Sequence, residues 1–205
     1  MIPLLRERFE RLVGDCTDGL FDIRVLLDDI TKRTEDIIVN PTNSQLRPGG
    51  GVCGAIHKAA GPELATVCSH TEVNAKGVRC QEGDAVITDA FKLRCKKVCH
   101  VVPPNAQRGV TESAKGALHN CYFNAMYQLR NEASCKSIAF PSVGTGKLAF
   151  PVKDAAEIAA EVICRECVVN KELKVVFCLQ DNNLVNVYKD AFRKCALHWK
   201  AQCHL

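Results

Sequence analysis

One stretch of the sequence, IIVNPTNSQLRPGGGVCGAIHKAAG at 37–61, constrains the fold more than any other. Three apolar β-forming residues at 37–39 predict a short buried strand, and the glycine run at 49–51 precedes apolar residues spaced along one helical face. We therefore predict a strand, a glycine loop and a helix start in direct succession. Bare glycine amides and the partial positive charge of a helix start suit a phosphate-bearing ligand. Taken alone, the glycine run is also compatible with an ordinary flexible turn.

Two carboxamides stand where the predicted strand ends. Asn40 and Asn43 follow it closely, and open α/β sheets bind their ligands at the carboxyl ends of strands. An amide both donates and accepts hydrogen bonds, so these residues suit sugar hydroxyls. For Asn40, a structural tie between the strand and the loop is an equal alternative.

The same arrangement recurs between residues 137 and 163. A strand at 137–140 leads into SVGTGK at 142–147, and Pro151 is expected at the first position of a helix. The fragment GTGK is not a nucleotide-triphosphatase loop, because Pro141 stands where the first glycine is required and Leu148 replaces the serine or threonine. We therefore expect two amide-bearing loops that face one cleft.

The rest of the chain alternates strands and helices. Apolar patterns predict further strands at 21–27, 83–90, 96–102 and 173–179, and helices at 62–70, 111–131 and 184–195. Strands joined by crossover helices require a mixed central sheet covered on both faces. We expect one α/β domain, a three-layer α/β/α sandwich of about six strands, over residues 1–205. Its helical extension at 1–19 would contain an amphipathic helix at 2–13.

Charge and cysteine content limit the classes of function. Lysine and arginine total 27, aspartate and glutamate total 23, and these charges are dispersed, so no nucleic-acid binding is expected. No apolar run reaches membrane-spanning length and no signal-type core begins the chain. We therefore expect no membrane association and an intracellular location, cytoplasmic or nuclear. The 13 cysteines lie mostly singly in apolar patterns, which indicates packed, reduced thiols. We predict no metal and no cofactor.

Both glycine loops resemble those of macro domains, the ADP-ribose-binding modules. N-x-x-N followed by GGGVCGAIHKAAG is similar to the first macro-domain loop, as found in MacroD-type and viral members. The stretch SIAFPSVGTGKLAFP at 137–151 is similar to the second loop, in the form carried by macro histone variants and by macro-domain poly(ADP-ribose) polymerases. The resemblance covers residues 21–195 and implies the same α/β/α architecture.

The resemblance also implies ligand contacts. DDIT at 28–31 is similar to the macro-domain motif GDIT, with Asp28 in place of the glycine. The aspartate of that motif accepts a hydrogen bond from the adenine amino group, which gives that role to Asp29. A turn aspartate that caps the next segment is the alternative. Asn43 would meet the distal ribose, and the two loops would meet the diphosphate. The predicted ligand-binding residues are Asp29, Ile30, Asn40, Asn43, Gly49, Gly50, Gly51, Val52, Ser142, Val143, Gly144, Thr145, Gly146, Lys147, Leu148 and Gln180.

For catalysis, the chain lacks a key residue of each of two hydrolytic groups within the family it resembles. MacroD-type hydrolases carry an aspartate that orients or activates water where this chain has Cys53, and thiols with the usual pKa of about 8.5 are mostly neutral at pH 7. Viral hydrolytic members lack that aspartate but keep an aromatic ring at the position of Leu148, which has no π system. If the chain is active, Asn43 and Cys53 are the candidate catalytic residues. His57 is expected to pack within its helix rather than to catalyse.

Two functions from different classes follow. The first is a module that binds ADP-ribose or mono-ADP-ribosylated protein. The second is a hydrolase that removes mono-ADP-ribose from aspartate or glutamate side chains, with deacetylation of O-acetyl-ADP-ribose as a variant of that chemistry. A degenerate scaffold without a ligand is the third alternative. The intact pair of loops favours binding, and Cys53 with Leu148 favours the first function over the second.

Overall fold

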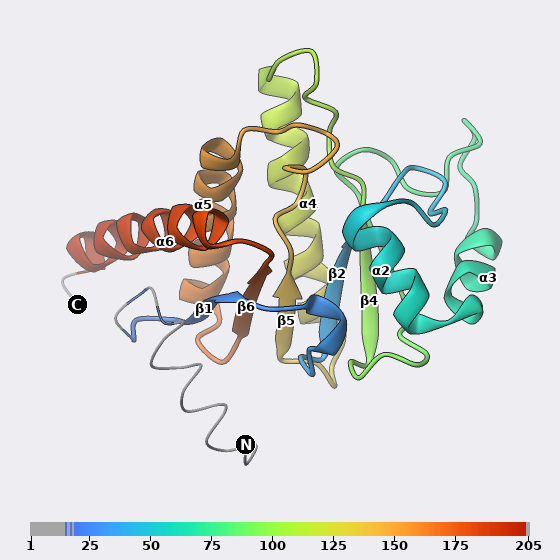
Figure 1. The fold of residues 1–205 in the computed structure, drawn as a ribbon. Coiled ribbons are helices and arrows are strands. Elements are labelled where there is room, and N and C mark those ends of the chain that lie inside the picture. The colour runs from blue at the N-terminus through green and yellow to red at the C-terminus, as the bar shows by residue number, and fades with distance from the viewer. Residues whose placement is uncertain (1–14, 16, 18, 204–205) are drawn as a thin grey trace.

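The computed structural model describes residues 15, 17 and 19–203 and shows a central sheet flanked by helices (Figure 1). The strands are β1 (Asp22–Leu27), β2 (Ile37–Pro41), β3 (Ala85–Asp89), β4 (Lys97–Val101), β5 (Ser137–Phe140) and β6 (Lys174–Leu179). The helices are the short 3-10 helix η1 (Ile30–Lys32), α2 (Gly51–Ala60), α3 (Pro62–His70), α4 (Glu112–Asn131), α5 (Val152–Val169) and α6 (Asn182–Cys203). In this described part, no helix is long and apolar enough to cross a membrane. The helix expected at 2–13 lies outside the described residues.

The sheet has the strand order β1-β6-β5-β2-β4-β3. Its first five strands run parallel, and β3 pairs antiparallel with β4 at one edge. Parallel neighbours need long crossover connections, which here contain the helices. The expected mixed sheet and α/β/α sandwich are confirmed.

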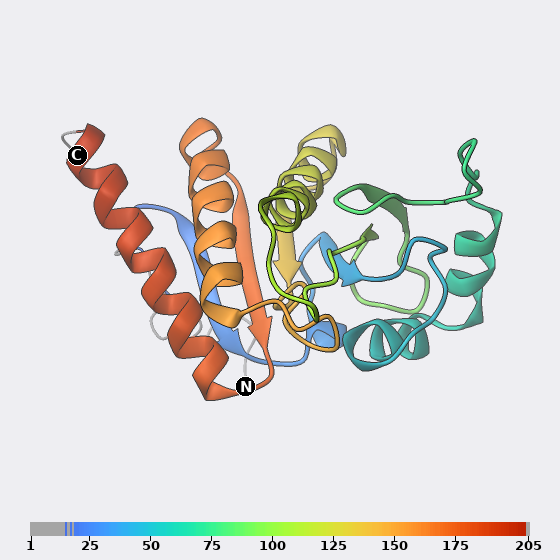
Figure 2. The same ribbon diagram turned by 90° about the horizontal axis from the view of Figure 1, so that it is seen from above.

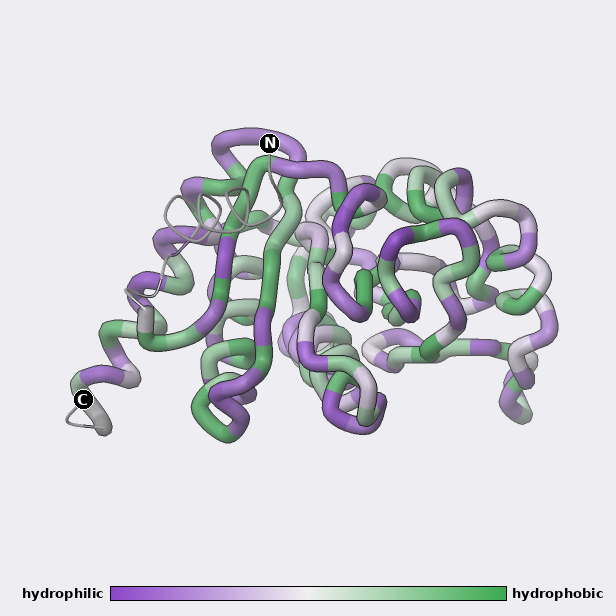
Figure 3. The backbone as a smooth tube through the Cα atoms, turned by 90° about the horizontal axis from the view of Figure 1, so that it is seen from below, coloured by the Kyte–Doolittle hydropathy of each residue, from purple (hydrophilic) through white to green (hydrophobic). Residues whose placement is uncertain are grey.

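Alternation along the strands divides the core between the two faces of the sheet. Ile37 and Val39 of β2 pack with α4, α5 and α6, whereas Ile38 packs with α2 and α3. In β6, Phe177 joins the first group and Val176 the second. Figure 2 shows α4, α5 and α6 along one face and α2 beyond the other, and Figure 3 shows apolar stretches along the strands. Both faces are therefore buried, which explains the nearly continuous apolar sequences of these strands.

Two local details differ from expectation. The sequence did not predict η1, which forms because the Asp29 side chain accepts a hydrogen bond from the backbone N–H of Thr31 (3.0 Å). Pro151 is the N-cap of α5, with ψ 129°, and the helix begins at Val152 rather than at the proline. Either position suits proline, because its missing N–H would have no intrahelical partner.

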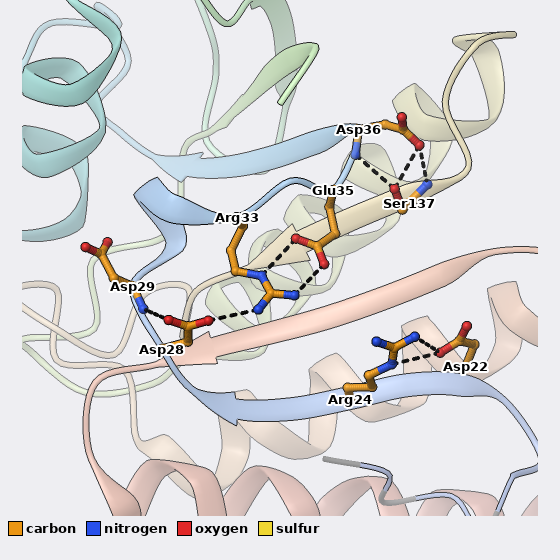
Figure 4. Close-up of polar contacts among 8 residues, drawn as sticks. All are labelled: Asp22, Arg24, Asp28, Asp29, Arg33, Glu35, Asp36 and Ser137. Atoms are coloured by element: carbon orange, nitrogen blue, oxygen red, sulfur yellow. Dashed lines mark hydrogen bonds and ion pairs between the residues drawn. The ribbon is translucent and has the colours of Figure 1, made fainter. Parts of the chain in front are cut away.

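A carboxylate clamp joins the amino ends of the central strands. Asp36 accepts hydrogen bonds from the backbone N–H groups of Lys136 (2.9 Å) and Ser137 (3.0 Å), and it pairs with Lys96 Nζ (2.7 Å). Figure 4 shows Asp36 beside Ser137. The clamp ties the starts of β2, β4 and β5 together, which leaves their carboxyl ends, at the opposite edge, free to carry loops.

Candidate functional site

The two glycine loops follow neighbouring strands at the carboxyl edge of the sheet. The first loop follows β2 and the second follows β5, and these parallel strands are neighbours, with Ile37 paired to Ile138 and Ile38 paired to Ala139. Each loop leads into a helix, α2 in the first case and α5 in the second. The sheet order therefore brings the two predicted phosphate-binding loops to adjacent positions.

The Asn43 amide organises the first loop. Its Nδ2 donates to the Arg47 carbonyl (2.8 Å), and its Oδ1 accepts from the backbone N–H groups of Gln45 (3.1 Å) and Arg47 (3.2 Å). Leu46 is fully buried below this turn, although its φ of 56° lies in the left-handed region. Asn43 thus builds an Asx-type turn, and its exposed amide keeps one N–H for a ligand.

Glycines determine how the first loop enters α2. Gly50 is the N-cap without a side-chain hydrogen bond, and Gly51 has a φ of 58°, a conformation that is strained for residues with a Cβ. A Cβ at Gly54 would lie 2.5 Å from the carbonyl oxygen of Gly49. The loop therefore folds back onto the first turn of α2 with clearance for glycine only. Gly54 was not among the predicted site residues, although the motif GGGVCG contains it; Val52, in the same turn, is half-buried.

Asn40 and Cys53 lie beneath the first loop. Asn40 is fully buried, and its Nδ2 lies 3.0 Å from Nδ1 of His100 on the paired strand β4. Cys53 is 6% exposed, and its Sγ lies 3.7 Å from Thr42 Oγ1 and 4.0 Å from the Arg47 carbonyl oxygen. For Asn40 this geometry matches the structural alternative, a tie below the strand exit. Cys53 packs the loop onto β2, which is a poor position for activating a water molecule.

Two neutral imidazoles belong to the same buried layer. His57 is 7% exposed, and neither of its ring nitrogens has a hydrogen-bond partner among the described residues. Its ring centroid lies 6.3 Å from that of His100, whose Nε2 is 2.9 Å from Thr88 Oγ1. Burial lowers the pKa of His57, and burial together with the neighbouring His57 lowers the pKa of His100 to about 3. His57 is therefore a packed helix residue, as expected.

The second loop has buried anchors and an exposed tip. Val143 and Phe150 are 1% exposed, and Ser142 Oγ lies 2.9 Å from the hydroxyl of the buried Tyr188. Thr145 Oγ1 donates to Ser142 Oγ (2.7 Å), which closes the turn. The other predicted residues of this loop are the buried Gly144 with φ 82°, the exposed Gly146 and Lys147, and the half-buried Leu148.

A neighbouring segment holds the tip of the second loop. The Ala106 N–H donates to the Leu148 carbonyl (2.9 Å), and Gln107 Nε2 donates to the Lys147 carbonyl (2.7 Å). These two hydrogen bonds hold the carbonyl groups of Lys147 and Leu148 in place. The peptide units at the tip of the loop are therefore fixed in orientation. Ala106 and Gln107 were not predicted, and the only signal for them was the sharp strand exit PPN at 103–105.

The residues predicted for the adenine directly follow β1 and β6. Asp29 is exposed, and its carboxylate accepts a hydrogen bond from the Thr31 hydroxyl (2.7 Å), which is the main reason that its pKa is lowered. Its second oxygen lies 3.4 Å from Lys32 Nζ. The side chain of Ile30 is buried in the core, so a ligand contact there would come from the backbone. Gln180 is exposed directly after β6. Asp29 thus caps η1, as the alternative interpretation required, and its carboxylate is exposed at the edge where the loops lie.

Arg33 supports this turn from below. Its guanidinium group, on a residue that is 6% exposed, donates to Asp28 Oδ2 (2.8 Å) and to both carboxylate oxygens of Glu35 (3.0 and 2.7 Å), as Figure 4 shows. The Asp28 N–H in turn donates to the Leu179 carbonyl of β6 (3.1 Å). Asp28, which stands where the resembled motif has glycine, therefore anchors the turn by charge-assisted hydrogen bonds.

Two cavities, of about 260 and 470 Å³, lie away from the loops. The smaller is lined by residues around the start of β1, and the larger lies beside β3 and α4. Among the residues described, no three histidine, cysteine, aspartate or glutamate side chains are grouped as metal ligands. The candidate site is accordingly defined by the two loops and by the ends of β1 and β6.

Known proteins share this sequence and fold. The family model described as Macro domain matches residues 39–159. A relative from Escherichia fergusonii named O-acetyl-ADP-ribose deacetylase is 44% identical over 141 residues, which cover 69% of this chain and 77% of the relative. The Oceanobacillus iheyensis macrodomain with ADP has a TM-score of 0.80 at 33% identity, and the match covers 86% of this chain and 92% of that one. The Trypanosoma brucei macrodomain in complex with ADP-ribose has a TM-score of 0.73 at 28% identity, with 86% and 70% covered.

Proposed function

Since this chain belongs to the macro-domain family, we propose that it is a module that binds ADP-ribose, free or attached to a protein as mono-ADP-ribose. The observation that carries the proposal is the adjacency of two glycine loops on the neighbouring strands β2 and β5. The ligands named for the similar macrodomain structures, ADP and ADP-ribose, support it.

Each part of ADP-ribose has a counterpart at this edge. Backbone amides at 50–52 and 144–147 hold the diphosphate without a metal ion, because successive N–H groups form an anion-binding concavity. The adenine amino group donates to the exposed Asp29 carboxylate, and Gln180 borders the ring. The remaining N–H of Asn43 donates to a hydroxyl of the distal ribose. The diphosphate thus occupies the centre and the two sugars lie on either side.

Calorimetric titration with ADP-ribose tests this assignment. We expect saturable binding of ADP-ribose and weaker binding of AMP, because AMP lacks the second phosphate and the distal ribose. Absence of a binding signal at millimolar ADP-ribose would overturn the proposal. Phosphate alone serves as the control for nonspecific anion binding.

Hydrolysis is a second candidate, and the name of the Escherichia fergusonii relative, O-acetyl-ADP-ribose deacetylase, favours it. The buried Cys53 supplies no carboxylate for water activation. In such a reaction the amides of the loops would hold the diphosphate, whose own oxygen would orient the attacking water, and Asn43 would position the ribose. This candidate requires the same bound ligand as the first.

Turnover assays separate the two candidates. O-acetyl-ADP-ribose and an automodified mono-ADP-ribosyltransferase are incubated with the protein, and the products are followed by chromatography. A hydrolase is supported if the unaltered protein removes the modification and Asn43→Ala does not, at ligand concentrations that saturate the variant. Substrate that survives excess protein, in a sample that binds ADP-ribose, eliminates hydrolysis and leaves the binding function intact.

A further inference from the structure

Two cysteine side chains meet between α5 and α6. Both helices begin at the carboxyl edge of the sheet and run in the same direction, and Figure 2 shows them side by side. Cys164 and Cys195 lie at nearly equal distances from the helix starts at Val152 and Asn182. The Cys195 thiol donates to the Ala160 carbonyl (3.4 Å), one turn before Cys164, and is hydrogen-bonded to the Cys164 thiol itself. The packing of the two helices thus brings two sulfur atoms together.

Cys195 differs from the other cysteines. Ten of the eleven cysteines whose side chains the structure describes are buried, and Cys195 alone is partly exposed. Burial raises the pKa of Cys167, on the same helix as Cys164, to about 12. The pKa of Cys195 is instead lowered, because the hydrogen bond with Cys164 outweighs burial and the Trp199 indole adds a second hydrogen bond. A stabilised thiolate that solvent can reach is the form that reacts with oxidants.

The partner thiol lies on the inner side of the pair. Cys164 is fully buried in the main core cluster, whereas Cys195 packs at its margin. An oxidant from solvent therefore reaches Cys195 first, and Cys164 is placed to attack the oxidised sulfur. This division into an attacking and a resolving cysteine is typical of thiol pairs that form disulfides reversibly.

We infer that Cys164 and Cys195 form a redox-responsive pair, which hydrogen peroxide converts into a disulfide between α5 and α6. The Cys195 thiolate attacks one peroxide oxygen, the O–O bond breaks, and the departing hydroxide takes a proton to become water. The Cys164 sulfur then attacks the resulting sulfenic acid, and the S–O bond breaks as the S–S bond forms. The leaving hydroxide takes the Cys164 proton, so the two thiols supply two electrons and peroxide becomes two waters. A dithiol reductant reverses the change.

The disulfide would join α5, which follows the second loop, to α6, which follows Gln180 at the end of β6. It closes a loop of the chain that contains β6, and closing such a loop restricts the unfolded chain. We therefore expect the Tm to rise by about 5 °C on oxidation. Because both cysteines lie well along their helices from the loops, the affinity for ADP-ribose should not change. The inference thus does not depend on the proposed function.

Peptide mapping of the whole 205-residue chain tests the inference. The reduced protein is treated with a small excess of hydrogen peroxide, the remaining thiols are alkylated, and peptides are identified by mass spectrometry. Before alkylation we expect the intact mass to fall by about 2 Da, and we expect a dithiol reductant to restore the original mass. After alkylation we expect a linked peptide pair that contains Cys164 and Cys195. A dominant link between other cysteines, or Cys195 recovered as an alkylated thiol after oxidation, would overturn the inference.

Single substitutions assign the two roles. Cys164→Ala also removes the hydrogen bond that lowers the pKa of Cys195, so Cys195 should be oxidised more slowly. Its oxidation should stop at the sulfenic acid, which dimedone traps, and the rise in Tm should vanish. Cys195→Ser should prevent both products, whereas the control Cys167→Ala, from the same buried face of α5, should still form the link. A link that persists without Cys164 contradicts the assignment. If a variant fails to fold, the peptide map of the unaltered protein decides alone.

Discussion

At the scale of single residues, the first loop depends on the absence of a side chain at position 54. In Gly54→Ala the new Cβ would stand 2.5 Å from the Gly49 carbonyl oxygen, which is backbone and cannot rotate away. We expect the loop to shift, with about a tenfold or greater loss of ADP-ribose affinity and about 1–3 kcal/mol of stability. Calorimetry and urea unfolding measure the two effects.

The matched control is Gly116→Ala in α4. A Cβ there meets no atom within 4 Å, so the substitution should leave binding unchanged and raise stability by about 1 kcal/mol through helix propensity. Equal effects of the two substitutions on binding would show that clearance at position 54 does not matter.

Asp29 combines a structural and a predicted ligand role. Its carboxylate caps η1 through Thr31 and is exposed at the site. Asp29→Ala removes the acceptor for the adenine amino group, so we expect about a tenfold loss of ADP-ribose affinity. Asp190→Ala, an exposed aspartate on α6 that pairs with Arg193, is the control. If Asp29→Ala lowers stability while the affinity stays the same, the capping role alone accounts for this residue.

At the scale of elements, the sheet is held together at its amino edge by Asp36. Burial by itself would raise the pKa of this carboxyl, but hydrogen bonds from Lys136, Lys96 and Ser137 lower it to about 2. The ionised form is therefore favoured in the folded protein. Since the unfolded pKa is higher, the resulting stability is present above about pH 4 and is lost as the pH falls towards 2.

Asp36→Asn should remove this contribution. At pH 7 we expect the free energy of unfolding to drop by about 2 kcal/mol, and the difference from the unaltered protein should shrink below pH 4. Urea unfolding at pH 7, 4 and 3 measures both effects, with Asp190→Asn as the exposed control. A difference that stays constant across this range would contradict the ionic basis of the clamp.

The turn before η1 shows how a charged residue, Asp28, can stand where the resembled motif has glycine. Asp28 is accommodated because the buried Arg33 has two carboxylates, Asp28 and Glu35, within hydrogen-bonding distance. The charges are paired, which is the condition under which a guanidinium group tolerates burial. The turn that carries Asp29 is thus fixed from its inner side.

At the scale of the whole molecule, acid should weaken the fold well before Asp36 titrates. His100 is buried with a pKa of about 3, and burial also lowers the pKa of His57, so both are neutral in the folded protein and become charged readily only on unfolding. Their folded-state pKa values lie below the ordinary value of about 6.5. Stability is therefore complete above pH 6.5 and declines as the pH falls through that value.

We expect the free energy of unfolding to decrease by about 2 kcal/mol between pH 7 and pH 5 from His100 alone. Urea unfolding across this range measures the change, and His70→Gln, at an exposed position, should not alter it. Stability that is flat from pH 7 to pH 5 would show that these imidazoles gain protons without unfolding.

The sequence alone determined where the strands and α-helices of the described residues lie, although not the 3-10 helix η1. Strands and helices have different apolar periods, 2 and 3.6 residues, and both periods are local, so α3 and β5 were predicted with their observed bounds. The two glycine loops were also predictable from sequence, because the conformational freedom of glycine is a property of the residue itself. The macro-domain resemblance, now confirmed as family membership, rests on these local motifs.

Only the tertiary structure decided which side chains reach the surface of the site and which support it. Asn40 and Asn43 look alike in sequence, yet the pairing of β2 with β4 buries the first against His100 and leaves the second in the exposed loop. The contact of 106–107 with the second loop and the approach of Cys164 to Cys195 likewise join segments that are distant in the chain. Such contacts follow from the order of strands and the packing of helices, which depend on the energy of the whole core rather than on any local pattern.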